Sequence, residues 1–212
     1  MIPRLRGAPV LYRAPHARPL VALTFDDGPS EWTPAIAAAL ERHGCKGTFF
    51  LLGPAVERDP ATVRALAAAG HELASHLWTH ANPEAMGHAA IRDEDGRTRA
   101  AIAAAAGVAA TLVRPPYCAA PKRVARAVPR GSTVVLRDVD PEDWRAEDPK
   151  RVVAAVLGTI RPGAIVCLHD GIAPGNRGTR TREVTAAALS ALVPALLERG
   201  LRPVTVSELL AR

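Results

Sequence analysis

Short runs of aliphatic and β-branched residues alternate with Ala-, Leu- and Arg-rich segments of helical spacing along the chain. This alternation constrains the fold most, because such strands joined by helices pair in parallel and bury both faces of their sheet. We count about seven strand–helix pairs. Strands are predicted at residues 21–25, 48–52, 72–75, 111–114, 133–137, 164–168 and 202–205.

The predicted helices have recognisable ends. Two Asp-Pro pairs place a capping carboxylate before a proline at the first helical position, at Asp59-Pro60 and Asp148-Pro149. Three glycines lie where left-handed C-terminal caps are expected: Gly44, Gly70 and Gly200.

An open doubly wound sheet and a closed (β/α) barrel both satisfy this pattern. The phosphate-binding motifs G-x-G-x-x-G and G-x-x-x-x-G-K-[ST] do not follow the first predicted strand, which removes the main support for an open nucleotide-binding sheet. We therefore favour an α/β barrel with about seven parallel strands. A chain of 212 residues fits a single domain, 1–212.

Charge and composition exclude several classes of protein. The 27 Lys and Arg residues exceed the 21 Asp and Glu residues by six, but they are scattered, and only 4% of residues are aromatic. This pattern does not predict a nucleic-acid partner. Three cysteines without C-x-x-C spacing predict neither a disulfide framework nor a cysteine zinc site.

No membrane span is expected, because the longest apolar stretches, 100–113 and 184–197, are shorter than the ~18 residues that a span requires. The first residues do not resemble a signal peptide. We therefore expect a cytoplasmic protein for the sequence as given, and an extracytoplasmic one if an export signal has been removed. The oligomeric state is not predicted.

Ionisable residues follow the predicted strands. Asp26 and Asp27 come after the first strand, on a turn made sharp by Gly28-Pro29. His76 and His80 come after the third at i and i+4, a spacing that one helical turn places on one face. Taken alone, the first pair is typical of a turn, and the histidine spacing needs a third ligand before it indicates a metal site.

Three further predicted strands lead to similar residues. The fourth ends in Arg114, and the sixth is followed by His169. The fifth leads to Asp140, Asp143 and Trp144. In parallel α/β folds, ligands bind at the carboxyl ends of strands. Five of seven strands ending in this way therefore indicate one shared site.

The motifs T-F-D-D-G-P, H-x-x-T-H, R-P-P-Y, D-P-x-D-W and L-H-D occur in this order between Thr24 and Asp170. The chain thereby resembles the polysaccharide deacetylases, which have the NodB-homology domain of carbohydrate esterase family four. Flanking segments extend the resemblance over roughly nine-tenths of the domain. It implies a distorted (β/α) barrel.

The resemblance also implies a metal site. Asp27, His76 and His80 are expected to bind one divalent cation. Two imidazoles and one carboxylate leave open coordination positions and suit catalytic zinc, with cobalt or nickel as alternatives.

The family implies roles for the proton-transferring residues. Asp26 is expected to be the general base that deprotonates the attacking water, held by Arg114. His169 is expected to protonate the departing amine. An acidic partner keeps His169 charged, and Asp143 is favoured over Asp140 for this role by its position in the motif.

Substrate contacts follow from the same resemblance. The backbone N–H of Tyr117 is expected to bind the oxyanion, and Trp144 and Leu168 are expected to wall a slot for the acetyl methyl group. Ordinary barrel packing remains the alternative for these last two.

Two residues depart from the family pattern. Leu77 stands where the family usually has Ser or Thr. Because leucine cannot hydrogen-bond a neighbouring loop, the affinity of the site for metal is in doubt. Cys118, which follows R-P-P-Y, could be oxidised, bind metal or only pack. Cys167 is predicted to be a small core residue. Surface or cap positions are expected for His16, His43, His71 and His88.

These observations predict a metal-dependent amidohydrolase that removes N-acetyl groups from amino sugars in chitin-like, peptidoglycan-like or smaller glycoconjugates. An N-acetylated sugar oligomer or glycoconjugate is the expected partner. Two alternatives stay open: an intracellular tailoring deacylase of an acylated small metabolite, and a barrel that binds carbohydrate without turnover.

Overall fold

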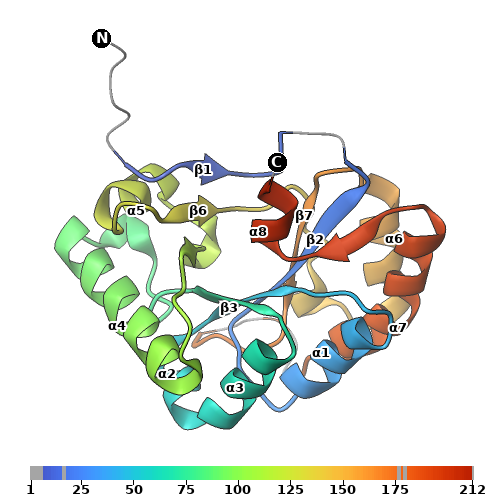
Figure 1. Ribbon diagram of the computed structural model, residues 1–212, viewed down its shortest axis with the longest axis horizontal. Helices are drawn as coiled ribbons and strands as arrows, with labels where there is room; N and C mark the ends of the chain where they lie inside the picture. The colour runs from blue at the N-terminus through green and yellow to red at the C-terminus, as the bar shows by residue number, and fades with distance from the viewer. Residues whose placement is uncertain (1–6, 16–17, 176–177, 179–180, 212) are drawn as a thin grey trace.

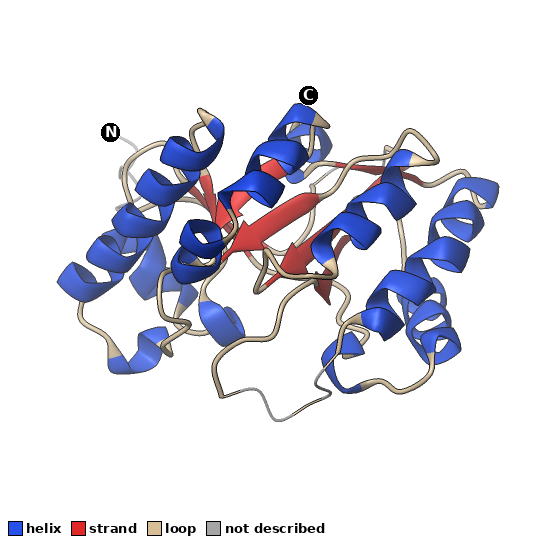
Figure 2. Cartoon of the chain, turned by 90° about the horizontal axis from the view of Figure 1, so that it is seen from below, coloured by secondary structure: helices blue, strands red, loops and turns tan. Residues whose placement is uncertain are grey.

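The computed structural model describes residues 7–15, 18–175, 178 and 181–211. Its strands lie in the interior and its helices surround them, as Figures 1 and 2 show. The strands are β1 (Val10–Leu11), β2 (Leu20–Asp26), β3 (Thr48–Leu51), β4 (Glu72–Ser75), β5 (Leu112–Val113), β6 (Thr133–Val135), β7 (Ile165–His169) and β8 (Arg202–Val204).

The helices begin and end between the strands, as the alternating pattern predicts. They are α1 (Thr33–Glu41), α2 (Gly53–Arg58), α3 (Pro60–Ala68), α4 (His88–Ala106), α5 (Pro121–Ala127), α6 (Pro149–Thr159), α7 (Glu183–Glu198) and α8 (Val206–Leu210). Three short 3-10 turns accompany them: η1 (Pro83–Ala85), η2 (Pro116–Cys118) and η3 (Asp143–Arg145).

The strands form one parallel sheet in the order β1-β6-β5-β4-β3-β2-β7. Strand β8 pairs with residues 20–22 of β2, and β3 pairs with residues 24–26. The segment that follows β6 meets β7, at the other end of the strand order, through a parallel bridge between Val139 and Val166. The arrangement is the predicted distorted (β/α) barrel.

Of the eight strands in the described part of the chain, seven coincide with predicted ones to within two residues at either end. The eighth, β1, has only two residues and was not predicted, because so short a segment carries no hydrophobic period.

The main core lies between the sheet and the helices. It includes Phe25 and Phe49, whose rings stack with centroids 4.9 Å apart, together with aliphatic side chains from α1, α6 and α7. The predicted helix ends are confirmed. Asp59 and Asp148 accept hydrogen bonds from backbone N–H groups in the first turns of α3 and α6.

The three predicted C-cap glycines all adopt positive φ, and these are Gly44, Gly70 and Gly200. Their left-handed conformation suits glycine because it has no Cβ. Within the described part of the chain, no helix is both long and apolar enough to cross a bilayer.

One histidine lies at a cap position, as predicted, but not at the surface: the backbone N–H of His71 donates to the carbonyl oxygen of Leu66 at 3.0 Å at the end of α3. His71 is buried, its Nδ1 accepts from the backbone N–H of Gly47 at 3.1 Å, and its Nε2 lies 3.1 Å from Glu41 Oε1. His43 and His88 are exposed as expected, and His16 lies outside the described residues.

Candidate active site

A cleft of about 600 Å³ opens at the carboxyl ends of the strands. Most of the predicted site residues line it, because parallel strands bring their last residues to one edge of the barrel. The lining residues are Asp26, Asp27, His76, His80, Tyr117, Cys118, Arg137, Asp140, Glu142, Trp144, Cys167, His169, Ala173, Pro174, Gly175 and Arg182.

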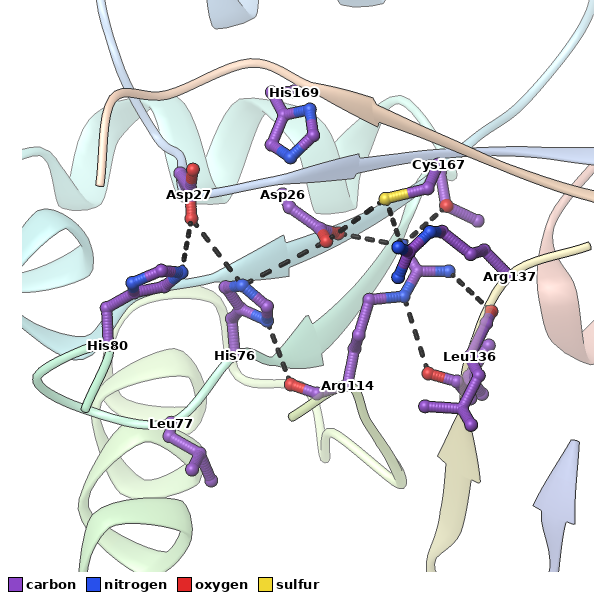
Figure 3. Close-up of polar contacts among 12 residues, drawn as sticks. Asp26, Asp27, His76, Leu77, His80, Arg114, Leu136, Arg137, Cys167 and His169 are labelled. Carbon is purple, nitrogen blue, oxygen red and sulfur yellow. Dashed lines mark hydrogen bonds and ion pairs between the residues drawn. The ribbon is translucent and has the colours of Figure 1, made fainter. Parts of the chain in front are cut away.

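The predicted metal trio is assembled on one side of this cleft. Asp27 Oδ1 lies 3.5 Å from Nε2 of both His76 and His80, and all three side chains are largely buried. Figure 3 shows the two imidazoles converging on the carboxylate. Two ligands of a tetrahedral ion at ~2.1 Å lie ~3.4 Å apart, so the observed spacing fits a shared cation.

Two of these ligands have an unusual backbone conformation, and a hydrogen bond orients the third. Asp27 and His80 have positive φ values of 79° and 61°, a backbone conformation that residues other than glycine adopt uncommonly. The Nδ1 of His76 donates to the carbonyl oxygen of Arg114 at 2.8 Å. This bond leaves Nε2 of His76 to face Asp27.

The polar atoms of the trio also suit a cation. Among the described residues, the buried Oδ1 of Asp27 accepts no hydrogen bond. Burial raises the pKa of Asp27, a cost that a bound cation would offset. Burial and the neighbouring His76 lower the pKa of His80 to about 3, so its imidazole is neutral as metal ligation requires.

Asp26 forms a buried ion pair with Arg114. Its Oδ1 accepts from Arg114 Nη1 at 2.7 Å, and the guanidinium also donates to Thr24 Oγ1 and to the carbonyl oxygen of Leu136. Burial opposes ionisation of Asp26, but the charge and hydrogen bond of Arg114 together with the charges of His76 and His169 outweigh burial and lower the pKa of that carboxyl. Asp26 is therefore a carboxylate, ready to accept a proton.

His169 is held by Asp143. The Nδ1 of His169 donates to Asp143 Oδ1 at 2.8 Å, and its backbone N–H donates to Asp143 Oδ2 at 2.9 Å. Burial opposes protonation of His169, but the charge and hydrogen bond of Asp143, with the weaker charges of Asp27 and Asp26, raise its pKa to about 9. Asp140 pairs instead with Arg137, whose Nε lies 2.6 Å from Asp140 Oδ2.

Asp26 and His169 are register partners in the pairing of β2 with β7. A carboxylate and a protonated imidazole thus lie on adjacent strands, next to the trio. This arrangement can remove a proton from one reacting group and supply one to another.

The predicted substrate contacts are only partly at the cleft. Tyr117 is 60% exposed, and its ring meets that of His80 edge-on with centroids 4.7 Å apart. Trp144 also lines the cleft. Leu168 was placed wrongly, because it points from the other face of β7 into the core between sheet and helices.

Cys167 is buried, as predicted for a small core residue, but it also faces the site. It lines the cleft, with Sγ 3.4 Å from Asp26 Oδ2 and 3.8 Å from Arg114 Nη1. Side chains at i and i+2 of a strand share a face, so the position of His169 already implied that Cys167 faces the cleft.

Leu77 and Cys118, the two residues that differ from the family pattern, lie in different surroundings. Leu77 is fully buried in an apolar cluster with Ile91 and Val113, and its side chain points away from the trio (Figure 3). Cys118 is partly exposed at the cleft. Cys118 also packs against the same apolar cluster as Leu77.

Sequence reasoning missed three supporting residues. Thr24 shares a strand face with Asp26, a signal that alternation along β2 offers. Thr185 donates to Asp143 Oδ2 at 2.6 Å from the first turn of α7. Arg182 is buried beside the cleft and donates to the carbonyl oxygen of Gly171 at 2.8 Å. Neither of these last two lies in a motif that ends a strand.

Ionisable groups gathered at the carboxyl edge of a (β/α) barrel are typical of barrel enzymes. The polysaccharide deacetylase family model matches residues 13–131. A chitooligosaccharide deacetylase of Bradyrhizobium sp. (strain ANU 289) is 40% identical over 187 residues, which are 85% of each chain. The chain belongs to the polysaccharide deacetylase family.

Solved structures agree with this assignment. A peptidoglycan N-acetylglucosamine deacetylase has a TM-score of 0.86 and 31% identity, with 96% of this chain and 92% of that chain covered. A CE4-family pseudoenzyme from Bacillus anthracis has a TM-score of 0.85 and 27% identity, with coverage of 95% and 69%. The fold therefore occurs both in enzymes and in a pseudoenzyme, so the site residues must decide between activity and its loss.

Proposed function

We propose that this chain, as a single catalytic domain over 1–212, removes N-acetyl groups from short soluble oligomers or glycoconjugates of N-acetylglucosamine. The observation that carries the proposal is the pairing of a charged carboxylate, Asp26, with a protonated imidazole, His169, on adjacent strands at one cleft. The names of the relatives, which act on chitooligosaccharides and peptidoglycan, support the substrate class.

Asp27, His76 and His80 would hold one divalent cation, with zinc favoured by two imidazoles and one carboxylate. When bound, such an ion supplies Lewis-acid polarisation of the acyl carbonyl and acidifies water. The deep burial of the trio keeps these ligands in place.

Asp26 takes the proton of the attacking water as the oxygen adds to the acyl carbon. Arg114 and Thr24 fix the position of Asp26, and the guanidinium keeps it ionised until that step. The backbone N–H of Tyr117 donates to the developing oxyanion.

His169 donates a proton to the amine nitrogen as the C–N bond breaks, because an amide nitrogen does not leave as an anion. Asp143 orients the ring and stabilises its charge. Trp144 offers the sugar an apolar surface at the cleft.

The experiment is acetate release from N-acetylglucosamine oligomers of a few units, peptidoglycan fragments, insoluble chitin and acetylated xylan, each with added zinc or cobalt. We expect release from the short soluble N-acetyl sugars and little from insoluble chitin. Turnover of acetylated xylan or a non-sugar amide alone would overturn the substrate class. No release from any substrate would favour the non-catalytic barrel.

A further inference from the structure

A second group of metal-ligand side chains lies in the same cleft. Asp26, Cys167 and His169 each offer one ligand atom, and the three atoms lie within 4.8 Å of one another. Cys167 Sγ is 3.4 Å from Asp26 Oδ2. A sulfur at ~2.3 Å and a carboxylate oxygen at ~2.0 Å from a tetrahedral zinc ion lie ~3.5 Å apart, so this pair already has the spacing of two ligands.

The backbone fixes all three positions. Cys167 and His169 alternate on β7 and so face the same side of the sheet. Asp26 is the register partner of His169 on β2. The group therefore sits on paired strands, where ligand positions are held more firmly than on loops.

The remaining atoms of these side chains are oriented for one shared ligand. Asp143 binds Nδ1 of His169, which leaves Nε2 for an ion, and a carboxylate in this position is a common partner of metal-binding imidazoles. Arg114 binds Oδ1 of Asp26, which leaves Oδ2 beside the thiol of Cys167.

We infer that Asp26, Cys167 and His169 form a second, inhibitory site for a thiophilic divalent cation such as zinc or cadmium. On binding, the S–H bond of Cys167 breaks, a metal–sulfur bond forms, and the thiol proton and any proton on Nε2 of His169 pass to solvent, with no change in oxidation state. The bound ion occupies the proposed base and acid together. Its inhibitory effect rests on the proposed function, whereas its binding does not.

The chemistry of the ligands gives this site a selectivity that the Asp27 trio lacks. Thiolate favours zinc and cadmium, whereas magnesium and manganese prefer oxygen ligands. The Asp27 trio contains no sulfur, so a thiolate-to-metal charge-transfer band reports only a cysteine-containing site.

The binding experiment titrates metal-free protein with cadmium and records this ultraviolet band together with bound metal per chain. We expect two ions and the band in the parent protein. Cys118→Ser should keep both ions and the band, and His80→Ala should keep the band. Cys167→Ser, with Cys167→Ala as a second variant, should lose the band and one ion. A single ion without the band, or a band that survives in both Cys167 variants, would overturn the inference.

A rate experiment tests the inhibition. Excess zinc should suppress acetate release by the parent protein, and excess magnesium should not. Relative to its own uninhibited rate, Cys167→Ser should need at least about tenfold more zinc for half-inhibition. Equal sensitivity of the two proteins would show that the second ion does not inhibit. If neither protein releases acetate, the proposed function fails, and the band alone decides whether the site exists.

Discussion

Asp143 binds His169 through both carboxylate oxygens, one to the ring Nδ1 at 2.8 Å and one to the backbone N–H at 2.9 Å. This double contact fixes the ring and its charge together. The proposed acid therefore depends on a residue that does not itself reach the reacting atoms.

Replacing Asp143 should move the alkaline limb of the pH–rate profile. The raised pKa of His169, about 9, means that the protonated acid persists up to that pH and activity falls as pH rises through it. In Asp143→Asn, burial still lowers the pKa of His169 while only the weaker charges of Asp27 and Asp26 raise it, so the limb should move to lower pH. The measurement is kcat/KM against pH, and an unmoved limb would contradict the role of Asp143.

The same pair should make stability depend on pH. The folded pKa of His169 is raised above its ordinary value of 6.5, so the stabilisation is complete below pH 6.5 and is lost as pH rises through about 9. Urea unfolding across this window should show the loss in the parent protein. Asp143→Asn should show a smaller loss, and parallel curves for both proteins would refute the linkage.

Thr185 should act as a positioning residue for Asp143. Thr185→Val removes the 2.6 Å hydrogen bond to the buried carboxylate and should lower kcat about tenfold or more, since such charged hydrogen bonds contribute ~1.5–3 kcal/mol. Thr185→Ser keeps the hydroxyl and should restore the rate and the alkaline limb. If Ser and Val behave alike, the hydroxyl has no such role.

The metal trio is tested by His80→Ala. Because His80 lies on a loop above the packed barrel, this change should abolish metal binding by the Asp27 trio and activity while leaving the thermal transition of the metal-free protein nearly unchanged. The exposed His43→Ala is a matched control and should keep both. If the His80→Ala protein keeps its full metal content and still releases acetate, His80 is not a metal ligand.

Replacing Asp26 and replacing Asp27 should have different effects, because the two adjacent carboxylates have different proposed roles. Asp26→Asn should keep metal in the Asp27 trio but lose turnover by about 10²–10⁴-fold, the range for removing a general base. Asp27→Asn should lose metal first, because its Oδ1 lies between both imidazoles. Metal content measured with both variants in the Cys167→Ser background, which lacks the cysteine-containing site, decides this, and equal losses in both would show that the roles are misassigned.

Much of the site was predictable because strand ends converge. The alternating pattern located seven strands, and their last residues brought Asp27, His76 and His80 together. Leu168 was misplaced although neighbouring strand residues point to opposite faces, so one of Leu168 and His169 had to leave the cleft.

Other features lie beyond a one-dimensional pattern. Asp140 and Asp143 have the same chemistry three positions apart, and only the fold decides which one meets β7. Thr185 lies in the first turn of a helix, without a strand end to mark it. Tertiary contacts of this kind leave no local period in the sequence.

The register between Asp26 and His169 has a consequence for how this scaffold can diversify. Their spacing is set by the hydrogen-bond ladder of β2 and β7 and not by the loops that line the rest of the cleft. Insertions and deletions in those loops can change the shape of the cleft, and so the substrates that it admits, while Asp26 and His169 keep their separation. Evolution could therefore exchange substrates on this barrel without rebuilding its chemistry.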